Sequence, residues 1–124
     1  RDNRGVMIRA LGGAETAETR LENRVGEPAA NPYLYMVSQI LSGLDGIDRR
    51  LEPPDPVDAP YETEAEPLPR SLMEALQALD DSTMFRAVLG DRFIDYILTL
   101  KQAEVSRFLA TVTDWEHREY FEIF

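Results

Sequence analysis

The 124-residue sequence contains no cysteine, so it can form no disulfide, no thiolate nucleophile and no cysteine-bound zinc site. This composition is what we expect of a cytoplasmic protein. Histidine occurs once, at His117, and we assign it no catalytic role because no nucleophile lies near it in the sequence. No apolar run approaches the roughly 18 residues of a membrane-spanning helix, and the first residues do not resemble a signal peptide. We therefore expect no membrane partner, and the abrupt start leads us to expect that upstream sequence is absent.

Positive charge is also scarce. The chain has 23 acidic and 13 basic residues and a formal net charge of −10, and its pI is about 4.5. Nucleic-acid binding depends on basic side chains that face phosphates, so we expect no nucleic-acid partner. The N-terminal segment differs from the rest, because its bases slightly outnumber its acids. The bases are Arg1, Arg4, Arg9, Arg20 and Arg24, and the acids are Asp2, Glu15, Glu18 and Glu22.

The order of local patterns predicts an α+β fold. Two strand-like segments within residues 4–25 flank a loop that contains two glycines, which indicates an antiparallel strand pair. Asn31 and Pro32 form a good N-cap and first-turn pair, so a helix should run from about residue 32 to residue 50. Its apolar positions recur every three or four residues over a wide face, and we therefore expect this helix to be buried in the core.

The second half of the chain should be mainly helical. Residues 52–69 are rich in proline and acids, a composition that favours an extended arm over a packed element. Ser71 and Glu74 have capping-box spacing, and Thr113 and Glu116 repeat it near the end. These signals predict helices over residues 71–124.

Arg20, Glu22 and Arg24 alternate along the second predicted strand. Residues two apart in a strand share a face and lie about 6.6 to 6.8 Å apart, so these side chains should form one charged row. Arginine offers paired donors to phosphate or carboxylate oxygens, and a glutamate between two arginines offers an oxygen ligand to Mg²⁺ or Mn²⁺. The row is suited to phosphoryl transfer, which depends on positioning and on neutralising phosphoryl charge.

Two observations from the residues leave alternatives open. A strand with this alternation can also be a solvated face whose cross-strand ion pairs each contribute at most about 1 kcal/mol. Arg4 and Arg9 are five residues apart, so a regular strand would point them to opposite faces. If both serve one site, the backbone must be irregular or Arg4 must precede the strand.

Four motifs in the same order resemble the C-terminal part of the catalytic domain of glutamine synthetase. They are NR-x4-R at residues 3–9, R-x-E-x-R at 20–24, EPAANPYL at 27–34 and GLDGI at 43–47. The resemblance implies an ATP-dependent ligase that joins L-glutamate to ammonia through γ-glutamyl phosphate and yields glutamine. It also implies a homo-oligomer of stacked rings, a dodecamer in several members of the family. Residues 1–124 alone should be inactive, because other parts of the site would lie upstream.

The resemblance assigns roles to five residues. Glu22 would be a ligand of Mg²⁺ or Mn²⁺, and Arg4 would contact the phosphoryl group in transfer. Arg9 and Arg20 would bind the phosphates of ATP, and Arg24 would contact glutamate or its phosphorylated intermediate. Arg4 and Arg24 are therefore the predicted catalytic residues.

The chain also departs from the ammonia-using pattern. It reads VGEPAANPYLYM where those enzymes commonly read FPDPAANPYL, and this variant resembles glutamine synthetase-like proteins, some of which use polyamines or other amines. A γ-glutamyl-amine ligase is therefore one alternative, and a non-catalytic oligomeric protein is another. Tyr61 lies near a tyrosine that some bacterial members adenylylate, but its setting, DAPYETEAE, differs, and we predict that it is not regulatory. The aromatic C-terminal segment could pack within the chain or insert into an opposite ring.

Overall fold

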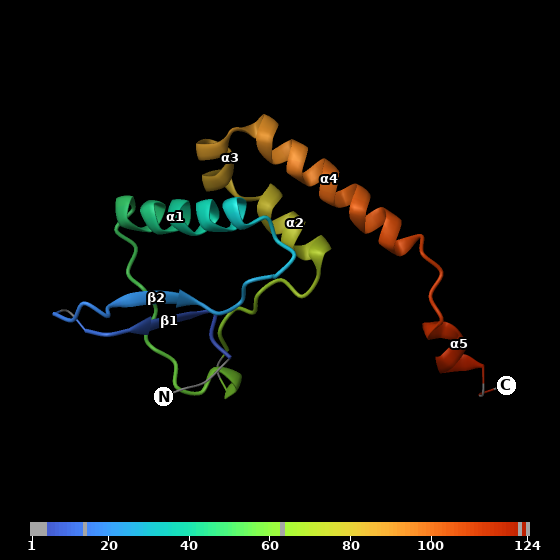
Figure 1. Cartoon of the computed structure of the whole chain (residues 1–124), viewed down its shortest axis with the longest axis horizontal. Helices are drawn as coiled ribbons and strands as arrows, with labels where there is room; N and C mark the ends of the chain where they lie inside the picture. The colour runs from blue at the N-terminus through green and yellow to red at the C-terminus, as the bar shows by residue number, and fades with distance from the viewer. Residues whose placement is uncertain (1–4, 14, 63, 122, 124) are drawn as a thin grey trace. The chain divides into compact units, whose positions relative to one another are not determined.

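The computed structural model describes residues 5–13, 15–62, 64–121 and 123. The chain divides into two compact units, Arg1–Glu66 and Pro67–Phe124 (Figure 1). The first unit contains an antiparallel strand pair and a long helix, and the second unit is helical. The predicted α+β class is confirmed. Among the described residues, no helix is both long enough and apolar enough to cross a membrane.

The strand pair is a hairpin of β1, Ile8–Leu11, and β2, Arg20–Asn23. The two strands are antiparallel, and Arg9 lies directly opposite Glu22. One further backbone hydrogen bond, 2.9 Å from the Arg24 N–H to the Met7 carbonyl, continues the pairing beyond the strands. The loop starts at Gly12, whose φ of 85° favours glycine. The sequence therefore forms the expected hairpin in a register that sets charged residues opposite each other.

Helix α1 runs from Pro32 to Asp48, and its start follows from the sequence. The Asn31 side chain accepts hydrogen bonds from the backbone N–H groups of Tyr33 and Leu34, at 3.0 and 3.2 Å. These bonds satisfy two of the helix-end donors that have no intrahelical partner. A side-chain bond then ties α1 to the hairpin, since the Asn23 amide nitrogen lies 2.8 Å from the Gln39 side-chain oxygen.

The prediction that this helix is buried is wrong for the chain as described, because none of its residues is buried. Its most regular apolar face, which we call the α1 stripe, is 52–75% exposed at every position. Helical periodicity shows which side chains share a face but not what covers that face. The side of α1 that reaches the hairpin carries Gln39, and the apolar side has no cover within its own unit. The α1 stripe consists of Tyr33, Met36, Ile40, Leu44 and Ile47.

The proline-rich arm that follows α1 forms one short element among its described residues, the 3₁₀ turn η1 at Pro60–Glu62. The Glu62 N–H donates to the Ala59 carbonyl at 3.0 Å and closes this turn. The remainder of the described arm has neither helix nor strand, as its prolines predict. The turn packs against Gly5, near the start of the hairpin.

The second unit contains the helices α2 (Leu72–Asp80), α3 (Thr83–Leu89), α4 (Asp91–Leu109) and α5 (Trp115–Tyr120). Ser71 caps α2 as predicted, because its side chain accepts from the Glu74 N–H at 3.1 Å. A small core of Leu76, Ile94 and Leu98 joins α2 to α4. Ile94 is only 1% exposed and is the most fully enclosed of the described residues. Further apolar side chains pack around this core from Leu79, Phe85, Leu89 and Val105.

One arginine organises the corner where α2, α3 and α4 meet. Arg86 forms ion pairs with Asp80, with Asp91 at 3.1 Å and with Asp95 at 2.9 Å. Hydrogen bonds to Asp95, Asp80 and Asp91 raise the pKa of the Arg86 guanidinium further above its usual value. Arg86 therefore stays charged at all relevant pH values. It belongs to α3, and its ion pairs link this helix to Asp80 of α2 and to Asp91 and Asp95 of α4.

The last helix is held by local contacts. The Trp115 and Tyr120 rings meet edge to face at 6.0 Å, and the single histidine, His117, stacks on Phe121 at 4.4 Å. The N-cap residue of α5 is Asp114 rather than Thr113, although the Thr113 hydroxyl does accept from the Trp115 N–H at 3.4 Å. Trp115 and Phe121 remain 52% and 69% exposed, so these local contacts leave much of the aromatic surface uncovered.

Candidate functional site on the charged face of the hairpin

The predicted charged row lies on one face of the hairpin. In the antiparallel register Arg9 is opposite Glu22 and Leu11 is opposite Arg20, and the Met7–Arg24 hydrogen bond continues the same alternation. Partners directly opposite each other share a face, as do residues two apart. Arg9, Arg20, Glu22 and Arg24 therefore belong to a single face, which we call the charged face.

Helix α1 supports the hairpin from the other side. Asn23 is adjacent to Glu22 in β2 and so points to the opposite face, where its side chain bonds to Gln39 of α1. In Figure 1 α1 runs alongside the hairpin within this unit. The charged face is consequently turned away from its own helix, which leaves it accessible to a ligand.

An ion pair on the charged face joins Arg9 and Glu22. The Arg9 Nη1 atom lies 3.6 Å from Glu22 Oε2, and the two side chains are 33% and 44% exposed. At this distance and exposure the pair contributes at most about 1 kcal/mol, because water screens the attraction. A ligand can therefore replace this contact at small cost.

Arg20, at the start of β2, and Arg24, just after its end, are held by different hydrogen bonds. Arg20 donates a hydrogen bond from Nη1 to the carbonyl of Glu18, two residues before it, at 3.0 Å. Arg24 is less exposed, and its backbone N–H is held by Met7. The structure thus brings Arg9, Arg20, Glu22 and Arg24 to one face. The predicted catalytic residue Arg4 lies outside the described residues.

Glu22 is the only carboxylate in the row, and this decides how a metal ion would fit. Within the described part of the chain, no three carboxylate or histidine side chains lie close enough together to hold a metal ion. Mg²⁺ is commonly bound through one or two carboxylates, with phosphate oxygens and water completing its shell. Glu22 fits the role of one such ligand, beside arginines that would hold the phosphates.

Two contacts at this site were not predicted from the sequence. The direct opposition of Arg9 and Glu22 depends on the register, which the loop geometry sets, and the alternation within one strand does not reveal it. The Asn23–Gln39 bond joins residues 16 apart. The sequence signal for this bond is weak, because a polar residue such as Asn23 on the inner face of a strand indicates only that it needs some polar partner.

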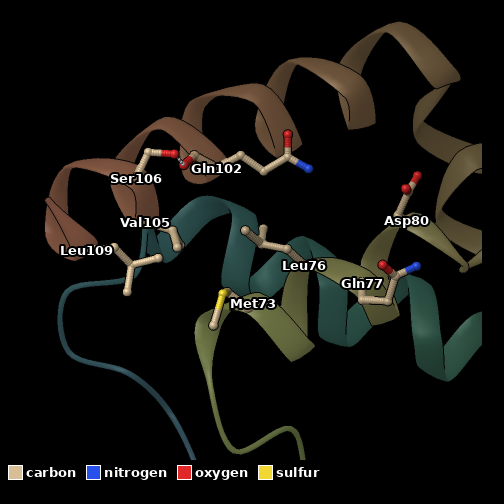
Figure 2. A pocket seen from close by; sticks show the side chains of 8 residues that line it. All are labelled: Met73, Leu76, Gln77, Asp80, Gln102, Val105, Ser106 and Leu109. Carbon is tan, nitrogen blue, oxygen red and sulfur yellow. Dashed lines mark hydrogen bonds between the residues drawn. The ribbon is translucent and has the colours of Figure 1, made fainter.

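A separate pocket of about 320 Å³ lies between α2 and α4 in the second unit (Figure 2). Its ionisable residue is Asp80, which already pairs with Arg86. The rest of the lining is apolar or uncharged, so we assign this pocket no chemistry. The lining residues are Met73, Leu76, Gln77, Asp80, Gln102, Val105, Ser106 and Leu109.

Comparison with known protein families identifies the class of protein to which this hairpin and these helices belong. Residues 1–120 match the family described as the catalytic domain of glutamine synthetase. The chain therefore belongs to the glutamine synthetase family, and it corresponds to the C-terminal part of the catalytic domain.

Several relatives are similar over nearly the whole chain. A γ-glutamylanilide synthase of Acinetobacter is 44% identical, with 99% of this chain and 27% of the relative aligned. A γ-glutamylethanolamide synthetase of Streptomyces coelicolor is 35% identical over 98% of the chain and 26% of the relative. A glutamine synthetase of Methanococcus maripaludis is 32% identical over 98% of the chain and 29% of the relative. The chain thus spans about a quarter of the length of these relatives, which include a glutamine synthetase and two γ-glutamyl-amine ligases.

Proposed function

We propose that this chain is part of an ATP-dependent ligase that joins the γ-carboxyl group of L-glutamate to an amine. In the first step a γ-carboxylate oxygen bonds to the γ-phosphorus of ATP, and the bond to ADP breaks. In the second step the amine nitrogen bonds to the γ-carbonyl carbon, the amine loses a proton and phosphate leaves. The observation that carries the proposal is the charged face, where three arginines and one glutamate are collected on one side of a hairpin.

Each residue of the charged face has a task in this reaction. Arg9 and Arg20 would hold the phosphates of ATP, because a guanidinium fork matches phosphate oxygens with paired donors. Arg24, at the other end of the row, would contact glutamate or γ-glutamyl phosphate, and Arg4 would contact the phosphoryl group in transfer. Glu22 would be one ligand of Mg²⁺ or Mn²⁺, which neutralises phosphate charge when it is bound. We also propose that the whole protein works in the cytoplasm as a homo-oligomer of stacked rings.

The acceptor is more specifically an organic amine in our proposal. Relatives named for anilide and ethanolamide products are 44% and 35% identical to this chain, whereas the glutamine synthetase of Methanococcus maripaludis is 32% identical. The sequence VGEPAANPYLYM, which differs from the common ammonia-using pattern, supports the same choice. Ammonia, the acceptor first expected from the family resemblance, remains the second candidate because the relatives include glutamine synthetases.

The test is phosphate release from ATP by the whole protein, with Mg²⁺ or Mn²⁺ and glutamate. The amine panel would contain ammonia, aniline, ethanolamine, isopropylamine and putrescine. We expect release that requires both glutamate and one organic amine, and mass spectrometry should detect the matching γ-glutamyl amide. Equal or faster turnover with ammonia would favour glutamine synthesis instead. No glutamate-dependent release with any amine would contradict the ligase and favour a non-catalytic oligomer.

Replacing Arg20 by lysine should weaken the use of ATP. Lysine keeps the charge but offers one compact ammonium in place of a planar fork, so one charge-assisted hydrogen bond is lost. Such a bond contributes about 1.5 to 3 kcal/mol, which corresponds to a rise in KM for ATP of about 10- to 100-fold. Steady-state kinetics with varied ATP would measure it.

Arg49→Lys is the matched control for this variant. Arg49 lies just after α1 and pairs with Asp45 at 3.0 Å, away from the charged face. Its replacement should leave the KM for ATP within about twofold, since exposed pairs of this kind contribute little. Equal ATP kinetics for Arg20→Lys and the unmodified protein would show that Arg20 does not contact the phosphates.

A further inference from the structure

The turn η1 makes an unusually close contact with the start of the hairpin. A methyl group built on Gly5 would lie 2.6 Å from Cγ of Pro60 and 2.9 Å from Cζ of Tyr61. Both distances are shorter than carbon atoms tolerate without a shift, since their optimal separation is about 3.5 to 4.0 Å. Gly5 therefore lets the side chains of Pro60 and Tyr61, more than fifty residues away in the sequence, lie close against its backbone.

This contact lies at one particular end of the charged face. Two residues after Gly5, the Met7 carbonyl accepts the hydrogen bond from the Arg24 N–H at 2.9 Å. Arg20 pairs with Leu11 at the opposite end of the hairpin. A displacement of Gly5 would thus reach the Arg24 end of the row first, while the Arg9–Glu22 and Leu11–Arg20 pairs lie further along the ladder.

The turn itself is built to hold its shape. The proline ring at position 60 fixes the backbone φ angle, and the Glu62 N–H bond to Ala59 closes the turn. The Tyr61 side chain is 83% exposed, so it contributes little to a hydrophobic core. The atom nearest to the added methyl group belongs to the proline ring, which cannot swing away as a flexible side chain would.

We propose that Pro60 and Tyr61 are positioning residues, which hold the start of the hairpin through Gly5 and so fix Arg24 for its contact with glutamate. This inference rests on the proposed ligase function and deepens it. It assigns the acidic arm a part in positioning the end of the charged face that carries Arg24, opposite the end that carries Arg20. It also explains why a glycine is present at position 5, where any side chain would meet the turn.

The test is Gly5→Ala in the whole protein, with kinetics for glutamate and ATP measured separately. The added methyl group should displace the start of the hairpin, and misplacement of about 1 Å can cost on the order of 100-fold in rate. We expect kcat to fall by about 10- to 100-fold and the KM for glutamate to rise, with the KM for ATP within about twofold of the original value. Gly43→Ala is the matched control, because a methyl group there meets no atom within 4 Å.

Rescue distinguishes positioning from general damage. In a Pro60→Ala/Tyr61→Ala background the atoms that the methyl group would meet are gone, so adding Gly5→Ala should change kcat by no more than about threefold. The background variant alone should raise the KM for glutamate and leave the KM for ATP unchanged, which keeps the test usable if Gly5→Ala does not fold.

Three results would overturn the inference. The first is unchanged kinetics in Gly5→Ala, and the second is an equal rise of the KM for glutamate and the KM for ATP in a folded Gly5→Ala protein. The third is an unchanged KM for glutamate in the Pro60→Ala/Tyr61→Ala variant. Failure of the proposed function would look different, because the unmodified protein would then release no phosphate with glutamate and any amine.

Discussion

Replacing Glu22 by glutamine should reduce glutamate-dependent phosphate release by about 100-fold or more. Glutamine has almost the same shape but no charge, so the charged face would keep its arginines and lose its only carboxylate. A metal ligand would be lost, and the positive charge of the arginines would no longer be offset near the phosphates. Equilibrium binding of ATP in the presence and absence of Mg²⁺ would show the cause directly. We expect the metal-dependent part of ATP binding to disappear.

Glu15→Gln is the control for this prediction. It makes the same chemical change in the exposed loop of the same hairpin, outside the charged row. Its activity should stay within about twofold of the unmodified protein, since exposed loop charges contribute little. Glu22→Gln with full activity and normal metal-dependent ATP binding would mean that Arg9 and Glu22 form only a surface ion pair, which is the alternative interpretation of the row.

Replacing Ile94 by alanine should lower the free energy of unfolding by about 2 to 5 kcal/mol. Ile94 is 1% exposed and belongs to the core that joins α2 to α4. The loss has two parts, the transfer free energy of the deleted carbons and the cavity that remains between the helices. With only Leu76 and Leu98 as the other buried residues of this described core, little packing remains to compensate. Equilibrium urea unfolding of the whole protein would measure the change.

Two further substitutions calibrate that measurement. Ile94→Val removes one methylene group and should cost about 0.5 to 1.5 kcal/mol. Val88→Ala, at a position that is 55% exposed in α3, should change stability by no more than about 0.5 kcal/mol. If Ile94→Ala and Val88→Ala had equal effects, the core between α2 and α4 would not be the main support of this unit.

The local elements could be predicted because short-range chemistry determines them. Asn31 and Pro32 marked the start of α1, and Ser71 marked the start of α2, since each side chain satisfies backbone donors within its own turn. The alternation of Arg20, Glu22 and Arg24 placed these residues on one face for an equally local reason.

What could not be predicted depends on contacts between distant segments. The partner of Glu22 across the hairpin follows from a loop whose backbone angles are not encoded in the alternation of the strand. In the chain as described no residue of α1 is buried, because an apolar face indicates that cover is needed and does not supply it. The contact of Gly5 with Pro60 and Tyr61 joins the two ends of the first unit, and no short motif reports it.

The α1 stripe has a consequence for the solution behaviour of these 124 residues as an isolated chain. Its five exposed apolar side chains favour association between molecules, and the net charge of −10 opposes it by mutual repulsion. Salt shortens the range of that repulsion to about 10 Å at 0.1 M and leaves the apolar attraction in place. Dilute, low-salt buffer should therefore keep the isolated chain dispersed, and raising the ionic strength should promote clustering.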